Sequence, residues 1–349
     1  MRAENIERVV VRGTNWVGDA VMSVPALREL RRVLPNAHIT LCTRGWAEGI
    51  FADADFIDQI LTYDKKGNSI NSVFKQAKKW RGYKFDLAIL LNNAFESALL
   101  AQIGGAQQRI GYRIDGRGFL LTDALSIPAW KDKRHEVFYY LNIIAQLEIK
   151  LFGETRVWER DPDILINVSE SRKNAARKFL AESGVDLTRK IIALCPGSTN
   201  SRAKRWQTES YSKLADLLQE NLNASVVLIG SPDELEVSND VCEKSTTKPI
   251  LLTGKTSLSE AVAALSVVNL LVTNDTGPAH IAPAVGTKTI VIFGPTTPET
   301  TRPFSDLAEI IVKPPGCAPC MLRDCPIDHR CMTAIKPFEI FKMIEQSIN

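Results

Sequence analysis

The sequence predicts an α/β protein built on parallel sheets that helices cover on both faces. Short apolar, β-branched runs alternate with segments of helical periodicity from one end of the chain to the other. Continuous apolar strands of this kind are typical of sheets that are buried on both faces. Domains average about 150 residues, so the chain of 349 residues predicts two domains.

Seven apolar runs are the predicted strands, and three periodic segments are the clearest predicted helices. The strands are expected at 9–12, 38–42, 87–91, 191–194, 226–229, 270–273 and 290–293, and the helices at 26–34, 211–219 and 258–264. Pro25 leaves two possibilities for the first helix. It begins after a Ser23 cap, or it begins near Gly18 and kinks.

The domain boundary is expected between residues 157 and 188. Residues 158–163 are polar and rich in turn formers, and 171–183 has the pattern of a charged linking helix. The last segment, 337–348, is amphipathic and is predicted to be helical.

Composition excludes several classes of protein. The chain is 45% hydrophobic and 24% charged, with a net charge of only +3, so we expect no strong affinity for nucleic acid. Its longest apolar runs fall far short of the roughly 20 residues of a membrane span. We expect no signal peptide, because the first residues lead directly into a charged segment and then a predicted strand. We therefore expect a cytoplasmic protein.

A glycine-containing turn follows the first predicted strand. Gly13 and Gly18 let the backbone turn sharply before a helix, and Asp19 lies at the start of that helix. Asp19 has two interpretations: a carboxylate that complements the helix dipole, or a general base at the strand end where ligands bind. The spacing differs from that of a dinucleotide fingerprint, so a nicotinamide cofactor is not supported.

Two similar turns lie in the second half of the chain. Ser198 and Thr199 precede Arg202, Lys204 and Arg205, a combination that suits a diphosphate but also suits a solvated basic loop. Trp206 is expected in the core.

In the other turn, Thr276 and Gly277 would offer backbone N–H groups to phosphate. Asp275 could accept sugar hydroxyls there. His280 follows one turn later and is equally consistent with a structural role. Glu234 follows a further strand. It could bind ribose hydroxyls, or it could place a negative charge at the start of a helix.

Cysteine usage separates into two groups. Cys42, Cys195 and Cys242 lie among apolar neighbours and are expected to be buried thiols. The other four are crowded near the C-terminus together with His329. Four thiolates, or three with His329, could form a structural zinc site, but the usual paired hairpins are absent, so disulfides and free thiols remain open. The crowded cysteines are Cys317, Cys320, Cys325 and Cys331.

Several of these segments, in the same order along nearly the whole chain, resemble the heptosyltransferase family of lipopolysaccharide core synthesis (glycosyltransferase family 9). The resemblance is carried by 16–19 (Trp-Val-Gly-Asp) with Pro25, 195–198 (Cys-Pro-Gly-Ser) with 204–206, and 273–280 (Thr-Asn-Asp-Thr-Gly-Pro-Ala-His), together with 92–99 and 109–113. It is strongest to the members that add heptose to a heptosyl-Kdo-lipid A inner core.

The resemblance implies a GT-B fold, in which two Rossmann-like domains face each other across a cleft. It assigns 1–168 to an acceptor-binding domain, 169–334 to a nucleotide-sugar domain and 335–349 to a helix that crosses back to the first domain. It also implies an inverting transferase that uses ADP-heptose and needs no cofactor or metal for the chemistry.

The resemblance also implies residue roles. Asp19 would be the base, and Lys204 would stabilise charge on the leaving diphosphate. The implied donor-binding residues are Gly18, Ser198, Thr199, Lys204, Glu234, Asp275, Thr276, Gly277 and His280. The implied acceptor-binding residues are Asn93, Ser97, Arg109 and Arg113.

A lipid-anchored acceptor implies a peripheral protein at the inner-membrane surface. The basic segment 75–84 could contact anionic headgroups, although a solvated helix face explains the same pattern. Three alternatives remain: a same-fold transferase with another nucleotide sugar or acceptor, a non-catalytic sugar-nucleotide-binding protein, and a hydrolase or epimerase acting on sugar nucleotides.

Overall fold

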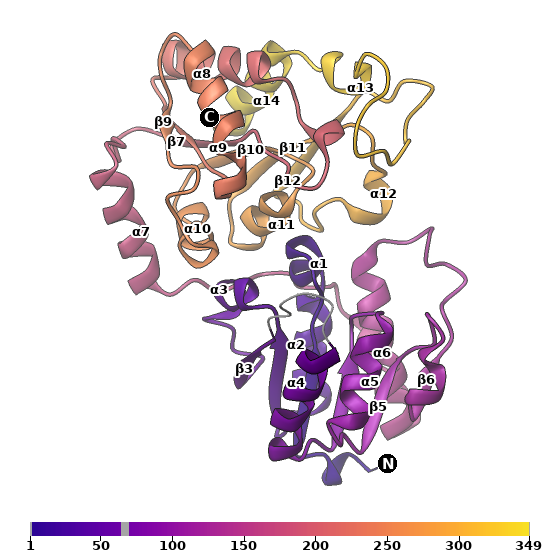
Figure 1. Cartoon of the computed structure of the whole chain (residues 1–349). Helices are drawn as coiled ribbons and strands as arrows, with labels where there is room; N and C mark the ends of the chain where they lie inside the picture. The colour runs from indigo at the N-terminus through magenta and orange to yellow at the C-terminus, as the bar shows by residue number, and fades with distance from the viewer. Residues whose placement is uncertain (1, 64–69, 349) are drawn as a thin grey trace. The chain divides into compact units, whose positions relative to one another are not determined.

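The computed structural model describes residues 2–63 and 70–348, and the chain forms two compact units, Met1–Ile164 and Leu165–Asn349 (Figure 1). The division lies within the expected interval and just before the expected boundary at 168. Each unit has its own six-stranded parallel sheet, so the predicted α/β class with two Rossmann-like units is confirmed.

Unit 1 is a doubly wound sheet. Its strands follow the order β3-β2-β1-β4-β5-β6, in parallel register throughout. The strands are β1 (Arg8–Arg12), β2 (His38–Thr43), β3 (Gln59–Thr62), β4 (Leu87–Leu90), β5 (Gln108–Tyr112) and β6 (Asp123–Leu125). The helices are α1 (Val17–Met22), α2 (Val24–Val33), α3 (Glu48–Phe51), α4 (Ile70–Tyr83), α5 (Phe95–Ile103) and α6 (Glu136–Phe152).

Unit 2 repeats this topology. Its strand order is β12-β11-β10-β7-β8-β9. The first strand of this unit, β7, lies in the middle of the sheet, as β1 does in unit 1. The strands are β7 (Ile191–Cys195), β8 (Ser225–Leu228), β9 (Ile250–Leu251), β10 (Leu270–Asn274), β11 (Lys288–Phe293) and β12 (Ala308–Val312). The helices are α7 (Glu170–Glu182), α8 (Thr208–Leu222), α9 (Leu235–Lys244), α10 (Leu258–Leu265), α11 (Gly277–Ala284), α12 (Pro298–Thr301), α13 (Arg330–Thr333) and α14 (Pro337–Ile348).

The central strands are buried along their whole length because both faces of each sheet are covered. Val9, Val10 and Val11 of β1 are completely buried, as are Leu271 and Val272 of β10. Such strands carry no alternation of polar and apolar residues, as expected for parallel sheets. In unit 1, residues of α4 and α5 join one face of β1, β2 and β4 in a common core.

The first helix begins near Gly18 and bends before Pro25, which confirms the second of the two possibilities. Helix α1 ends at Met22, and α2 begins at Val24 with Pro25 in its first turn. Ser23 lies between them, and its hydroxyl donates to the carbonyl of Ala20 at 2.7 Å instead of capping α2.

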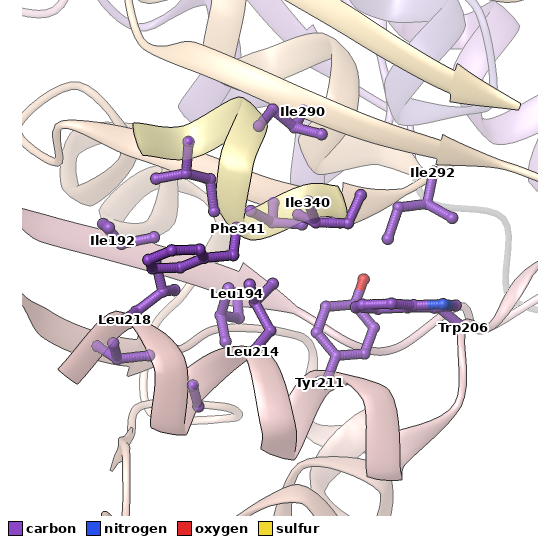
Figure 2. Packing of buried hydrophobic residues seen from close by; sticks show 14 of the residues in the cluster. Ile192, Leu194, Trp206, Tyr211, Leu214, Leu218, Ile290, Ile292, Ile340 and Phe341 are labelled. Carbon is purple, nitrogen blue, oxygen red and sulfur yellow. The ribbon is translucent and has the colours of Figure 1, made fainter. Parts of the chain in front are cut away.

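Helix α14 belongs to the core of unit 2. Ile340 and Phe341 pack over Ile192 and Leu194 of β7 and over α8 (Figure 2). The sequence led us to expect a helix crossing back to the first domain. The apolar face of α14 is instead buried on its own unit, and Trp206 lies in the same core, as predicted.

The switch point of each sheet positions the candidate residues. Strand β1 lies between β2 and β4, and β10 lies between β11 and β7, so the winding reverses beside these strands. Loops at the carboxyl ends of strands at such a point diverge and leave room for a ligand. The segments that follow β1 and β4 in unit 1, and β7 and β10 in unit 2, contain most of the site residues that the sequence predicts, including Asp19, Lys204 and Asp275.

Candidate functional site

Asn274, the last residue of β10, joins the two loops of the unit 2 switch point. Its amide nitrogen donates to the carbonyls of Pro196 at 2.9 Å and Gly197 at 3.0 Å. Its amide oxygen accepts from the Trp206 backbone N–H at 3.0 Å and from the Tyr211 hydroxyl at 3.2 Å. The side chain is completely buried. Asn274 therefore fixes the loop after β7 at both of its ends.

Lys204 and Asp275 are brought into direct contact. The Lys204 ammonium lies 2.8 Å from Asp275 Oδ2 and 3.2 Å from the Asp275 carbonyl. Thr296, in the loop after β11, donates to the same Oδ2 at 2.7 Å. Asp275 is 7% exposed at its side chain and Lys204 is 27% exposed. The lysine thus stays accessible while the carboxylate beneath it is held from two sides.

Glu234 occupies a groove that two glycines leave open. A Cβ on Gly197 would lie 2.3 Å from the Glu234 carboxyl group, and one on Gly230 would lie 2.9 Å from Oε2. The carboxylate accepts from the Ser231 backbone N–H at 2.8 Å and from the Ser231 hydroxyl at 3.1 Å. Both glycines are therefore needed for Glu234 to reach the loop after β7. Its oxygens already cap the turn at Ser231, so the helix-start interpretation is confirmed and a ribose contact stays a prediction.

The remaining donor-side candidates surround this cluster. Ser198 is buried, and its carbonyl accepts from the Arg205 guanidinium at 3.1 and 3.2 Å. Thr199 is exposed beside Glu234. Gly277 begins α11, with Thr276 as the residue before it. Pro278 has no N–H and the Ala279 N–H donates to the Thr276 carbonyl at 3.0 Å, so the N–H groups of Thr276 and Gly277 are the ones that suit an anion here.

His280 lies inside α11 and is 6% exposed. Its position on a buried helix face agrees with the structural interpretation as well as with a donor-side role, so the donor-side role remains a prediction.

The cysteine-rich loop braces the loop that carries Lys204. The Ala203 N–H donates to the Arg323 carbonyl at 2.9 Å, and His329 Nε2 lies 2.6 Å from the Ala203 carbonyl. Arg202 forms an ion pair with Asp324 at 2.6 Å. The sequence did not reveal this role, because the two loops are about 120 residues apart.

Of the three possibilities for the crowded cysteines, the structure has free thiols and forms no zinc site among the described residues. All seven cysteines are free thiols. In 2–63 and 70–348, no group of three or more His, Cys, Asp or Glu side chains is placed to hold a metal ion. Cys317 and Cys320 are exposed, whereas Cys331 is buried in α13, and His329 is engaged with Ala203. The four cysteines differ too much in their surroundings to act as one ligand set.

In unit 1, Asp19 lies in the first turn of α1, directly after the loop that follows β1. Arg12 holds this loop: it is 2% exposed and donates to the Gly13 carbonyl at 2.6 Å and to the Asn15 side chain at 3.2 Å. Trp16 is the residue before α1, so Asp19 does not cap the helix. Gly18 lies beside it in the same turn.

The surroundings of Asp19 shift the pKa of its carboxyl group strongly. Burial raises the pKa of Asp19 to about 6, and Glu136 adds to the increase. A hydrogen bond from the Tyr140 hydroxyl to Oδ1 at 3.0 Å and the nearby Lys131 ammonium oppose it. A carboxylate with this pKa is ionised at neutral pH and is a better base than a solvated one.

Asn93 and Ser97 follow β4 at the same edge of the sheet. The Asn93 amide donates to the Tyr139 hydroxyl at 3.2 Å, and the buried Ser97 hydroxyl donates to Asn92 Oδ1 at 2.9 Å. Arg117, which the sequence did not single out, is completely buried and donates to the carbonyl of Asn92 and to Asn93 Oδ1. Burial lowers the pKa of Arg117 to about 10. It remains a cation at neutral pH and orders this loop.

The two predicted acceptor arginines lie at opposite ends of β5. Arg109 is near the amino end, and its guanidinium donates to the carbonyls of Leu120 and Ala106, both at 2.7 Å. The guanidinium therefore binds backbone carbonyls, at the opposite edge of the sheet from Asp19. An acceptor role for Arg109 is not supported. Arg113 follows the carboxyl end of β5 and is exposed, so it remains a candidate.

Across 2–63 and 70–348, no helix combines the length and apolar character that crossing a bilayer requires.

Comparison with known proteins identifies the family of the chain. The model of glycosyltransferase family 9 (heptosyltransferase) matches residues 73–330. The lipopolysaccharide heptosyltransferase 2 of Escherichia coli is 29% identical over 87% of this chain and 87% of its own length. The E. coli ADP-heptose LPS heptosyltransferase II structure has a TM-score of 0.83 at 25% identity, covering 98% of both chains.

A family 9 glycosyltransferase structure from Veillonella parvula has a TM-score of 0.84 at 25% identity, covering 100% of this chain and 98% of its own. The matched range includes Lys204 and Asp275 but begins after Asp19. The chain therefore belongs to glycosyltransferase family 9, the heptosyltransferase family.

Proposed function

We propose that this glycosyltransferase moves heptose from ADP-L-glycero-D-manno-heptose to the heptosyl-Kdo-lipid A inner core of lipopolysaccharide. The observation that carries the proposal is similarity, over most of both chains, to proteins named heptosyltransferase 2. The two switch-point sites support it, because one offers a base and the other offers a cation for a diphosphate.

The proposed reaction is a single displacement. A hydroxyl oxygen of the acceptor attacks the anomeric carbon of the donor as the bond from that carbon to the diphosphate oxygen breaks. Asp19 takes the hydroxyl proton, and ADP leaves with the bond's electron pair. Lys204 and the amides at the start of α11 neutralise the charge that develops on the diphosphate. These groups make a metal unnecessary for the chemistry.

Each unit has a proposed ligand. The donor binds unit 2, where Ser198, Thr199 and Thr276 lie near Lys204 and Asp275 holds the sugar. The acceptor binds unit 1 through Asn93 and Ser97, which follow β4, and through Arg113, which follows β5 in the same sheet. Anionic groups of the inner core suit the exposed Arg113.

ADP release measures the proposed reaction directly. We expect release from ADP-heptose only when heptosyl-Kdo-lipid A is present, and its loss in Asp19→Asn. Turnover with heptose-free Kdo-lipid A would transfer the assignment to the first heptose addition. Release without any acceptor would indicate a hydrolase, and donor binding without turnover on either acceptor would indicate a sugar-nucleotide-binding protein.

We also propose that α4 contacts the anionic membrane surface that carries the acceptor, on the cytoplasmic face of the inner membrane. Lys75, Lys78, Lys79 and Arg81 are exposed, no acid interrupts them between residues 70 and 84, and Phe74 is 57% exposed among them. An exposed aromatic ring beside several cations is typical of a surface that docks on anionic lipid.

Vesicle sedimentation tests this contact. Wild type should bind phosphatidylglycerol vesicles and not phosphatidylcholine vesicles. About 0.5 M salt should release the protein, because the attraction between its cations and the anionic lipid is largely screened at that ionic strength. Lys78→Glu with Lys79→Glu should abolish binding. Lys178→Glu with Lys213→Glu, which makes the same charge change on α7 and α8, should leave it intact. Binding that is insensitive to salt would contradict the proposal.

A further inference from the structure

The hydroxyl of Tyr140 is the group that holds the Asp19 carboxylate. It donates to Asp19 Oδ1 at 3.0 Å, joining α6 to α1 across 121 residues of sequence. Tyr140 is 4% exposed, so the hydroxyl has little access to water as an alternative partner. A hydrogen bond from a buried hydroxyl to a carboxylate is both strong and directional.

Two further charged groups face Asp19, and they are bound to each other. Lys131 lies in the loop before α6 and forms an ion pair with Glu136 at 2.5 Å. Lys131 also lies over the ring of Tyr139, 4.6 Å from its centroid. Among the described residues, α2 also contacts α1 but adds no charged side chain to this set.

The paired charges have opposing effects on Asp19. Burial raises the pKa of Asp19, the Tyr140 hydrogen bond lowers it, Glu136 raises it and Lys131 lowers it. Because Lys131 and Glu136 lie within one ion pair, their influences on a third group largely cancel. The Tyr140 hydroxyl is therefore the main contact that favours the ionised carboxylate.

We propose that Tyr140 is a positioning residue for the transfer reaction. Its hydroxyl holds Asp19 Oδ1, which leaves Oδ2 free among the described contacts to take the proton of the acceptor hydroxyl. The inference rests on the proposed role of Asp19 as the base. Tyr140 itself does not take up or release a proton in the step.

The test is the pH profile of kcat/KM for Tyr140→Phe, which removes one oxygen and keeps the ring. Losing a hydrogen bond to the charged form raises the pKa of a carboxylate, so the acid limb should move up by about one pH unit. At pH 7 the variant should be slower by about twofold, because a shift of about one unit leaves about half of Asp19 protonated at that pH. KM for ADP-heptose should not change, because the donor is bound by the other unit.

Tyr112→Phe is the matched control. Tyr112 is also a completely buried tyrosine against α6, but its hydroxyl donates to the Tyr139 carbonyl at 2.9 Å and does not reach Asp19. Any general loosening of α6 should appear in both variants. Only Tyr140→Phe should move the acid limb.

Titration of carboxyl-labelled protein by ¹³C NMR separates this inference from the proposed function. The Asp19 resonance is identified by its absence in Asp19→Asn, and its titration needs no turnover. If Asp19→Asn is inactive but Tyr140→Phe moves neither the acid limb nor the Asp19 resonance, the inference is overturned and the base role stands. If Asp19→Asn stays active, the base role fails and the positioning role fails with it.

Discussion

The ammonium of Lys204 lies 2.8 Å from Oδ2 of Asp275, so the loop after β7 and the loop after β10 meet through one ion pair. The carboxylate is nearly buried and is also held by Thr296, whereas the lysine is partly exposed. An ammonium held in this way is oriented before a ligand arrives. Preorganised charge of this kind stabilises a leaving group without costly rearrangement.

Lys204→Ala should lower kcat by about 10²–10³-fold, because the charge that develops on the diphosphate loses its nearest cation. Steady-state ADP release at saturating donor and acceptor measures this effect. Lys204→Arg should recover only part of the rate, because a planar guanidinium does not match the position of an ammonium. The exposed Lys213 of α8 provides the control, since Lys213→Ala should behave as wild type. Equal kcat in Lys204→Ala and wild type would exclude this role.

Asn274→Ala should destabilise unit 2 and weaken ADP binding together. The substitution leaves two carbonyls and the Trp206 backbone N–H without their buried partner, at a cost of about 3 kcal/mol, whereas the Tyr211 hydroxyl keeps the Cys195 carbonyl as an acceptor. Calorimetric binding of ADP and the midpoint of urea unfolding give the two quantities.

A second asparagine, just before β10, separates these two effects. Asn269 precedes the opposite end of the strand, and its side chain accepts from the Ile191 N–H at 2.8 Å. Asn269→Ala should therefore lower stability while leaving ADP affinity unchanged. If both variants lose affinity equally, the loops after β7 and β10 do not depend on Asn274 in particular.

The strands that the sequence predicted are those in the middle of each sheet. β2, β1, β4, β11, β10, β7 and β8 all have continuous apolar runs because both of their faces are covered. The four edge strands β3, β6, β9 and β12 were missed because they are short or carry polar residues. β5 was missed although it is central, since it begins with Gln108 and Arg109.

In the candidate site, too, the sequence predicted the residues with a local pattern and missed those without one. Asp19, Lys204 and Asp275 were found because each follows a strand within a short, recognisable turn. Their partners were not found. Tyr140 is 121 residues from Asp19, and Thr296 is 21 residues from Asp275. Such contacts depend on how helices and loops pack, and no local pattern records them.

Arg109 shows how a residue type can mislead. An arginine suits an anionic acceptor in principle. The register of β5, which the sequence pattern did not reveal, puts Arg109 near the amino end of the strand, where backbone carbonyls take up its guanidinium.

The cysteine-rich loop should behave as a set of free thiols. With the native protein, iodoacetamide should modify the exposed Cys317 and Cys320 quickly, and the buried Cys42 and Cys195 only after unfolding. Mass spectrometry of the digested protein gives the order of reaction. Treatment with phenanthroline should change neither the melting temperature nor ADP release. One bound zinc or iron per chain, with Cys317 and Cys320 protected from alkylation, would show that the loop is arranged differently in solution.

Glu148 should make unit 1 sensitive to acid. Burial alone would raise the pKa of Glu148, but hydrogen bonds from Arg32, the Arg156 N–H and Thr155 outweigh it and lower the pKa to about 2. An unfolded glutamate titrates near about 4.3. Because the folded pKa is the lower one, the stabilisation is complete above the unfolded pKa and is lost as the pH falls toward about 2.

Urea unfolding between pH 7 and pH 3 tests this dependence by tryptophan fluorescence, which reports mainly on unit 1. Five of the six tryptophans lie there, at positions 16, 46, 80, 130 and 158. Glu148→Gln should be less stable than wild type at pH 7 by about 1–3 kcal/mol and should lose less stability on acidification. Glu159→Gln removes an ion pair whose side chains are 58–60% exposed and should leave the wild-type pH dependence unchanged. Parallel curves for wild type and Glu148→Gln would mean that another carboxylate accounts for the acid sensitivity of unit 1.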